Sequence, residues 1–144
     1  MTPDNVCFII YLVIQSIFFD EKPSDLEGSM IDVVNDKYER QMKKGVLDML
    51  VLRLLKYEAK YGYQIIQEMK EKSEETFLLK DGTFYPILYR LEDEALVISR
   101  WSEAKGKQVP RKYYEITQSG LKALDEIEAL WKRISVGISK IMED

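Results

Sequence analysis

The stretch KDGTFYPILYRLEDEAL, from Lys80 to Leu96, has a different chemistry at each of its ends. Its first residues are small, aromatic or basic, whereas its end carries three consecutive acids, Glu92 to Glu94. Leu88 and Leu91 recur at the spacing of one helix face. Pro86 is compatible with a helix only in or near the first turn, where backbone amides have no helical partners. The stretch therefore predicts a helix that begins shortly before this proline.

The small residues before the proline indicate what this helix does. Asp81 or Thr83 is expected to begin and cap the helix, which should end near Ala95. A recognition helix enters the DNA major groove by its N-terminal residues, where small side chains permit close approach and free amides favour phosphate. A plain amphipathic core helix remains the alternative. The residues of this segment expected to contact DNA are Lys80, Gly82, Thr83, Tyr85, Tyr89 and Arg90, the last by a bidentate contact to guanine.

Beyond the helix, the period of the sequence changes. The segments VISRWS (Val97–Ser102) and RKYYEIT (Arg111–Thr117) are rich in β-branched and aromatic residues, and they predict a β-hairpin. Between Arg100 and Tyr113 there are five basic residues and one acid, so the hairpin tip is basic. The tip is either a solvated charged turn or, as we expect, a wing that contacts phosphates. The wing residues expected to do so are Lys105, Lys107, Arg111 and Lys112.

Two more helices are expected upstream. The segment Lys44–Lys56 is apolar on nearly all sides, so we expect its own core to cover one side and a second subunit to cover the other. The next helix spans about Tyr63–Lys72. At its start we expect Tyr63 to be buried and Tyr61 to lie near a phosphate, with core packing as the alternative for both. Phe77–Leu79 has the composition of a brief strand.

The last helix is expected over Gln118–Met142 and is too long to be buried by so small a domain. Its apolar residues recur every three or four positions, which is typical of a helix that pairs with another. The expected dimerisation residues are Leu121, Leu124, Ile127, Trp131, Ile134 and Ile138. Together the elements indicate a mainly α fold, a winged helix-turn-helix of three helices and a hairpin wing over residues 30–117, with a C-terminal dimerisation helix over residues 118–144.

The N-terminal residues 1–29 have an uncertain status. Val6–Phe19 is an almost wholly apolar run of 14 residues, shorter than the roughly 20 that a membrane span needs. The run is a membrane or partner anchor, a strand or helix packed on the domain, or the product of a wrong start assignment upstream of Met30. We favour the last, and we expect no membrane association.

The composition excludes several kinds of chemistry. The chain of 144 residues has no histidine and one cysteine, Cys7, so a catalytic triad with histidine and an intramolecular disulfide are impossible. No Gly-rich phosphate loop and no distinctive carboxylate pair is present. The sequence therefore predicts no enzyme, no metal site and no cofactor. The net charge of −4 does not exclude nucleic acid, because the basic residues of the wing are clustered.

Four segments, in order, resemble the PadR family of bacterial transcriptional regulators: KKGVLDMLVLRLL, YGYQI, DGTFYPILYRLE and RKYYEITQSG. The resemblance runs from about Lys43 to the C-terminus. It implies a cytoplasmic homodimeric winged-helix repressor whose last helix dimerises and whose DNA affinity changes when an effector binds. The family usually has glycine where Ala95 stands, so a left-handed cap there would cost about 1 kcal/mol more in this chain. Residues 1–29 have no counterpart in the family.

The resemblance also gives Trp131 a possible role. The multidrug-responsive small PadR-like regulators place a tryptophan fourteen residues after the threonine of the YYxxT block, which is the step from Thr117 to Trp131. In those relatives paired tryptophans stack a flat aromatic ligand between subunits. The alternative is an aromatic residue of the core or of the dimer seam. Trp101, on the first strand of the wing, is expected to be structural.

The sequence therefore predicts a DNA-binding transcriptional repressor that binds a palindromic operator as a homodimer and is released by a small-molecule effector. Its partners would be double-stranded DNA, a second copy of the chain and a small aromatic effector. The alternative is a winged-helix module that binds proteins and no DNA, for which an acidic wing would be expected.

Overall fold

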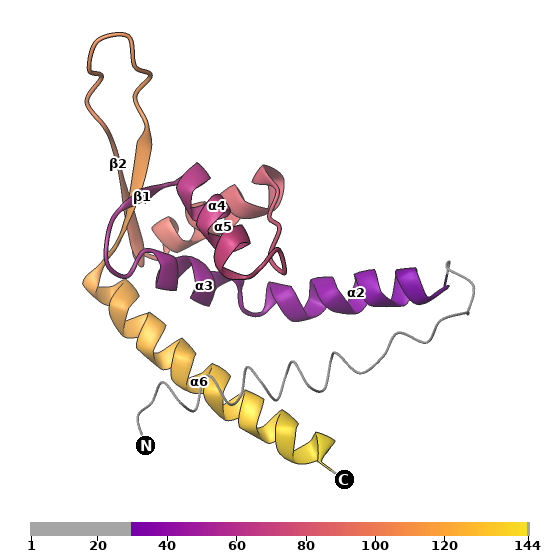
Figure 1. Cartoon of the computed structure of the whole chain (residues 1–144). Helices are drawn as coiled ribbons and strands as arrows, with labels where there is room; N and C mark the ends of the chain where they lie inside the picture. The colour runs from indigo at the N-terminus through magenta and orange to yellow at the C-terminus, as the bar shows by residue number, and fades with distance from the viewer. Residues whose placement is uncertain (1–29, 144) are drawn as a thin grey trace. The chain divides into compact units, whose positions relative to one another are not determined.

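The computed structural model describes residues 30–143, and the apolar run at Val6–Phe19 lies outside them. The elements in chain order are α2 (Met30–Lys44), α3 (Leu47–Leu54), β1 (Lys60–Tyr61), α4 (Gly62–Lys72), α5 (Asp81–Asp93), β2 (Val97–Trp101), β3 (Lys112–Ile116) and α6 (Gln118–Met142) (Figure 1). The fold is a mainly α winged helix with a long C-terminal helix, as predicted. Two compact units divide the described residues: Tyr38–Glu126, and a second that includes residues 30–37 and 127–143.

The predicted helix Lys44–Lys56 is present as the shorter α3, and a separate helix, α2, precedes it. α2 ends at Lys44 and α3 begins at Leu47, with a turn at Gly45 and Val46 closed by the hydrogen bond from Val46 N to Lys43 O, 3.1 Å. Five apolar side chains of the α3 segment are buried in the single chain: Leu47, Met49, Val51, Leu52 and Leu55. These five are therefore core residues, as expected for one side of the segment, and the cover of its other side by a second subunit stays a prediction.

The core of the Tyr38–Glu126 unit lies among α3, α4, α5 and the sheet. α4 contributes Ile65 and Met69, and α5 contributes the residues at its helical spacing, Phe84, Ile87, Leu88 and Leu91. Tyr114 of β3 is also buried, and burial is the main cause that raises the pKa of Tyr114 to about 12. Its ring therefore stays neutral at any ordinary pH, as a core position requires.

The sheet has three antiparallel strands in the order β1-β3-β2. β2 and β3 are joined from Val97↔Ile116 to Trp101↔Lys112, and β1 adds two pairs on the far side of β3. β1 was not predicted, because two residues carry no period that a sequence could show. The expected strand at Phe77–Leu79 is absent: this segment is linked to the end of α4 instead, by the hydrogen bond from Phe77 N to Ser73 Oγ, 3.0 Å.

The hairpin of β2 and β3 continues past its strands as a projecting wing (Figure 1). Ser102 and Arg111 close its arms with two bonds: Ser102 N donates to Arg111 O at 2.7 Å, and Arg111 N donates to Ser102 Oγ at 2.9 Å. At the tip Gly106 has a φ of +67°, a left-handed conformation that glycine adopts without a steric penalty. The basic residues of the tip are thereby held away from the helices.

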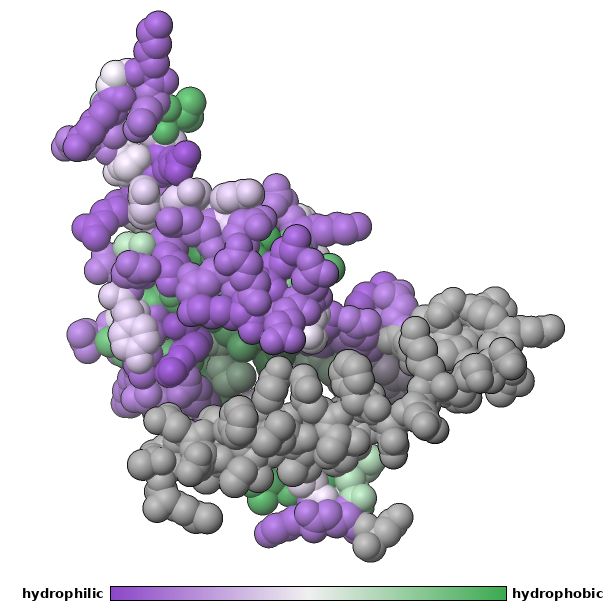
Figure 2. Space-filling view, in the orientation of Figure 1, coloured by the Kyte–Doolittle hydropathy of each residue, from purple (hydrophilic) through white to green (hydrophobic). Residues whose placement is uncertain are grey.

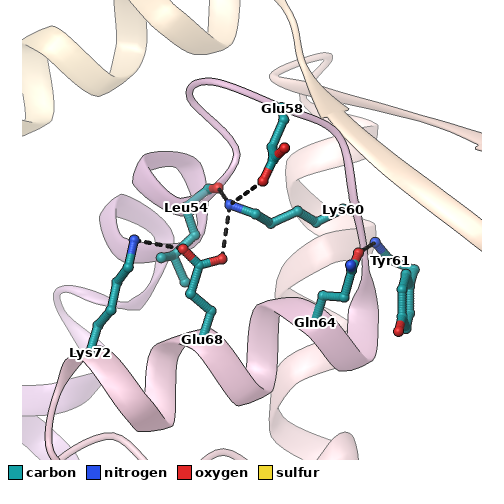
Figure 3. Close-up of polar contacts among 7 residues, drawn as sticks. All are labelled: Leu54, Glu58, Lys60, Tyr61, Gln64, Glu68 and Lys72. Carbon is teal, nitrogen blue, oxygen red and sulfur yellow. Dashed lines mark hydrogen bonds and ion pairs between the residues drawn. The ribbon is translucent and has the colours of Figure 1, made fainter.

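A buried lysine connects α3 with α4 (Figure 3). Lys60 is 9% exposed, and its Nζ donates to the carbonyl of Leu54, the last residue of α3, at 2.6 Å. The same Nζ lies 2.9 Å from Glu68 Oε2 on α4, and Glu68 also pairs with Lys72 at 2.6 Å. Burial alone would raise the pKa of Glu68, but the hydrogen bonds and charges of Lys72 and Lys60 outweigh it and lower the pKa below its usual value. The cluster thus satisfies a buried cation and a helix end at once.

The end of α5 and the start of α6 meet at one junction. Leu96 N donates to Leu91 O at 2.9 Å and Ala95 N to Glu92 O at 3.0 Å, the pattern of a Schellman cap, with Ala95 at a φ of 58°. The left-handed conformation expected at Ala95 is therefore present, in a residue that has a Cβ. The Thr117 hydroxyl donates to Ala95 O at 2.7 Å. Its Oγ1 also accepts a hydrogen bond from Gly120 N at 3.0 Å, and this bond caps α6.

Ala95→Gly should raise the free energy of unfolding by about 1 kcal/mol, because glycine adopts a positive φ without the clash of a Cβ. Urea unfolding followed by circular dichroism would measure the change. Ala129→Gly is the matched control: Ala129 is exposed within α6, where the same replacement should lower stability by about 0.5–1 kcal/mol. A loss of stability in both variants would contradict the proposed strain at Ala95.

Glu68→Gln should lower the free energy of unfolding by about 1–3 kcal/mol at pH 7, because Lys60 loses the nearer of its two carboxylate partners and keeps only Glu58, at 3.7 Å. The pKa of Glu68 is lower in the folded chain, so its contribution is complete above the unfolded value, about 4.3, and is lost as the pH falls through the folded value. The difference in the free energy of unfolding between the wild type and Glu68→Gln should therefore become smaller as the pH falls from 6 to 3. Urea titrations at several pH values would test this, with the exposed Glu71→Gln on the same helix as control. A deficit of constant size would contradict the assignment.

Candidate nucleic-acid interface

The first turn of α5 is open and has no side-chain cap. The N-cap residue is Lys80, with extended backbone and no side-chain hydrogen bond to the helix, so the predicted capping by Asp81 or Thr83 is wrong. The amides of Thr83 and Phe84 both donate to Lys80 O at 3.0 Å, which closes the turn through the backbone instead. The side chains of Lys80, Asp81 and Thr83 are exposed, and a Cβ at Gly82 would meet nothing within 4 Å. This helix end is accessible to a large partner.

Tyr85 joins α5 to the start of α4. A Cβ at Gly62 would lie 2.6 Å from Tyr85 Oη, so the ring can occupy this place only because residue 62 is a glycine. Burial, followed by the charge of Asp81 and by Tyr89, raises the pKa of Tyr85 above its usual value. Tyr89 lies one turn later, with its ring centroid 6.2 Å from that of Tyr85, and it is 51% exposed. Of the two tyrosines, Tyr89 therefore offers more surface to a partner.

Arg90 lies in the last turn of α5 and pairs with Asp48 of α3 through its Nη2. Sequence spacing alone would favour Glu94, one helical turn further along, as the ion-pair partner of Arg90. Asp48 is instead 42 residues away in the chain. Both side chains of this pair are substantially exposed, so its net contribution to stability is at most about 1 kcal/mol. The pair links α3 to α5 and holds the guanidinium in place.

The sheet separates the predicted site residues into two groups. In an antiparallel pair, residues directly opposite each other lie on the same face. On the face toward α5, Ser99 Oγ donates to Glu92 Oε1 at 2.5 Å, and Lys112 Nζ lies 5.8 Å from the ring centroid of Tyr89. Tyr113 belongs to the opposite face, since its neighbour Tyr114 is the buried one. Lys112 is thus placed beside α5.

Tyr61 and Arg111 form the second group, on the face of the sheet away from α5. The Arg111 guanidinium lies 4.5 Å from the Tyr61 ring centroid, a cation–π contact, and the Tyr113 ring meets Tyr61 edge-on at 5.6 Å. Tyr63 stacks alongside Tyr61 at 6.5 Å and is 61% exposed, so its predicted burial is wrong. The reason is that α4 buries the side of Ile65 and Met69 and turns Tyr63 outward.

The tip of the wing presents two cations with no acidic partner. Lys105 and Lys107 are exposed, and neither forms an ion pair with any residue from 30 to 143. Figure 2 shows hydrophilic residues over most of this projecting end. At the base of the wing, by contrast, Arg100 is paired across the strands with Glu115 at 2.7 Å. The cations of the tip are therefore available for an external anion.

Trp101 does not fill the structural role expected from the sequence. It is the last residue of β2 and is 67% exposed, beyond the part of the sheet that the helices cover. Its exposure was not predictable from the strand pattern, because VISRW gives no sign of where the helical cover ends.

The apolar residues predicted to form a dimer seam on α6 have different environments. Leu124 is fully buried in the single chain, so its assignment to the seam is wrong: the first turns of α6 belong to the core of the Tyr38–Glu126 unit. Leu121, Ile127 and Trp131 are half-buried. Ile134 and Ile138 are exposed, as are the neighbouring Leu130 and Ile141.

Within residues 30–143, no group of three or more His, Cys, Asp or Glu side chains is placed to hold a metal ion. Among the described helices, none combines the length and apolar character that crossing a membrane requires.

Known proteins are similar to this chain in both fold and sequence. A PadR family transcriptional regulator from Eggerthella lenta has a crystal structure that matches with a TM-score of 0.70 at 33% identity, over 78% of this chain and 96% of that one. A transcriptional regulator from Clostridium thermocellum matches with a TM-score of 0.67 at 28% identity, over 72% and 99% of the two chains. An uncharacterized protein of Lysinibacillus sphaericus is 33% identical over 102 residues, which are 69% of this chain and 91% of that protein.

The family itself is identified by the match of residues 51–126 to the profile of the Transcriptional regulator PadR-like family, which runs from the middle of α3 into α6. This range contains the last three of the four segments that carried the resemblance in the sequence, and the end of the first. The chain therefore belongs to the PadR-like family of transcriptional regulators, and it is a DNA-binding regulator rather than an enzyme.

Proposed function

We propose that the protein is a cytoplasmic repressor that binds a palindromic operator as a homodimer and is released by a small-molecule effector. The observation that supports DNA contact most directly is the wing. Lys105 and Lys107 are exposed cations without an acidic partner among residues 30–143, and they stand on a hairpin whose base is bound to α5 through Ser99 and Glu92. An anion that spans α5 and the wing tip would meet both at once, as a DNA backbone does.

α5 supplies the part that enters the major groove. Its first turn has exposed small residues, no side-chain cap and the positive end of the helix dipole, all of which favour close approach to a phosphate. Asp81 opposes this, because it places a negative charge in the same turn. Lys80 is adjacent to Asp81 and offsets that charge. Tyr89 and Arg90, further along, are the candidates for contacts to base edges.

The dimer would form through the second half of α6. Leu130, Ile134, Ile138 and Ile141 follow helical spacing and are exposed in the single chain, where apolar surface of this kind is unfavourable in water. A second copy of α6 is the natural cover. A two-fold dimer would present two copies of α5 to successive major grooves roughly 34 Å apart, which is why the operator would be palindromic. We therefore expect two protein chains bound to each duplex, which analytical ultracentrifugation of the complex would measure.

The effector would act at the dimer helices. Trp131 is half-buried on α6, amid the apolar residues proposed for the dimer. A flat aromatic molecule stacked on this indole would bind one arrangement of the two chains more tightly than another and so shift the population that fits the operator. The alternative role for Trp131 is that of an aromatic residue packed in the dimer seam, in which case no such molecule binds.

Lys105→Ala combined with Lys107→Ala should weaken binding to all duplexes alike, because phosphate contacts carry no base information. The slope of log K against log salt should become less steep by about one unit for each phosphate that is no longer neutralised. Anisotropy titrations of the duplex just upstream of its own gene, and of a random duplex, would measure both. The matched control is Lys132→Ala, a lysine of α6 that belongs neither to α5 nor to the wing. An unchanged salt slope would remove the wing from the interface, and no binding to any duplex would favour the protein-interaction module.

Arg90→Ala should reduce the preference for the upstream duplex over the random duplex by about 1–3 kcal/mol if the guanidinium reads a guanine. Asp48→Asn is the matched variant: it removes the same ion pair but keeps the cation, so discrimination should be maintained. Both variants should change the free energy of unfolding by no more than about 1 kcal/mol. If Arg90→Ala leaves discrimination intact, the role of Arg90 is to link α3 to α5, and Tyr85, Tyr89 and the backbone near Gly82 must read the sequence.

A further inference from the structure

Trp101 stands at the edge between the recognition helix and the wing. It pairs with Lys112 across the hairpin, so the two side chains lie on one face of the sheet. That face is the one toward α5, because Val97 at its other end is buried and Ser99 in its middle bonds to Glu92 of α5. Trp101 thus lies on the face of the sheet that is turned toward α5, at the end of β2 where that face is exposed.

The indole of Trp101 has few interactions with the described part of the chain. It is 67% exposed, and within residues 30–143 it forms no hydrogen bond and no ring contact. Tryptophan combines a large apolar surface with a single N–H donor, a combination that favours a partner with apolar and acceptor atoms side by side. An exposed indole on a short strand contributes little to the core, so folding does not account for its position.

The surroundings of Trp101 are cationic. Lys112 stands opposite it, and Lys105 and Lys107 lie beyond it along the hairpin. The only acid between positions 100 and 113 is Glu103. A partner on this surface is therefore an anion, and one long enough to reach from Tyr89 on α5 to the wing tip is a polyanion.

We propose that Trp101 contacts the DNA backbone where the duplex passes from α5 to the wing. The indole ring packs on a deoxyribose, and its Nε1–H donates to a phosphate oxygen. Lys112, held beside Tyr89, supplies the charge next to it. This inference deepens the proposed function and rests on it, since it requires that α5 and the wing bind the same duplex.

The affinity test uses three variants of the full chain and a mixed-sequence duplex of about 30 base pairs at low salt, because a backbone contact does not depend on sequence. Trp101→Ala should weaken binding about ten-fold or more, the loss expected for a hydrogen bond to a charged group together with its packing. Trp101→Phe keeps an apolar ring and should lose less. In both variants the salt slope should stay as in the wild type, because no charge is removed. Ile98→Ala, an exposed apolar residue on the same strand and the opposite face, should bind as the wild type does.

Tryptophan emission supplies a direct measurement. Adding the duplex to the wild type should quench emission and reduce its quenching by acrylamide, and this change should be absent in Trp101→Phe, which retains Trp131. If the wild type binds the duplex but Trp101→Ala binds equally well, or if the emission change persists in Trp101→Phe, the inference is wrong while the proposed function stands. If the wild type binds no duplex, the proposed function has failed as well. An equal loss in Ile98→Ala would show that the wing as a whole had been disturbed and would also overturn the role of Trp101.

Discussion

The contact between Gly120 and the carbonyl of Leu96 holds the winged helix together. A Cβ at residue 120 would lie 2.1 Å from that oxygen, a distance no side chain can adopt, so the backbone of α6 packs directly on the turn that ends α5. Thr117 completes the junction from the other side: its amide donates to Leu96 O at 3.0 Å and its hydroxyl to Ala95 O. α5, both strands of the wing and the first turn of α6 are fixed to one another within these few residues.

This junction has a consequence for regulation. The wing begins at Val97 and returns to Ile116, so both of its strands end beside the same turn. Because the backbone of α6 lies directly against this turn, a change in the direction of its first turn would shift the end of α5 and the base of the wing as well. An effector that acts on the proposed dimer helices would reach the DNA-binding elements by this route.

The cations of the chain serve two purposes, and the structure separates them. Lys60, Arg90 and Arg100 are engaged with carboxylates of their own domain, and Arg111 lies on the Tyr61 ring. Lys80, Lys105 and Lys107 are exposed and form no ion pair within residues 30–143. An acidic protein can therefore present a basic surface, because its acids compensate other cations and leave Lys80, Lys105 and Lys107 without a carboxylate among residues 30–143. The negative charge of the whole chain gives no indication of this surface.

The sequence by itself determined the elements whose signals are local. Helical spacing placed α5 and α6, and the change of period placed the hairpin. The left-handed cap at Ala95 was expected only from the resemblance to the family, which usually has glycine at this position. The tertiary structure alone decided which side chains are paired with a distant residue and which are buried. Asp48 and Arg90 are 42 residues apart, and no spacing rule connects them. Tyr63 and Trp101 proved exposed and Leu124 buried because burial depends on which distant element covers a face. A periodic pattern of residues indicates that a helix or strand has an apolar face, and the rest of the fold determines which element packs against that face.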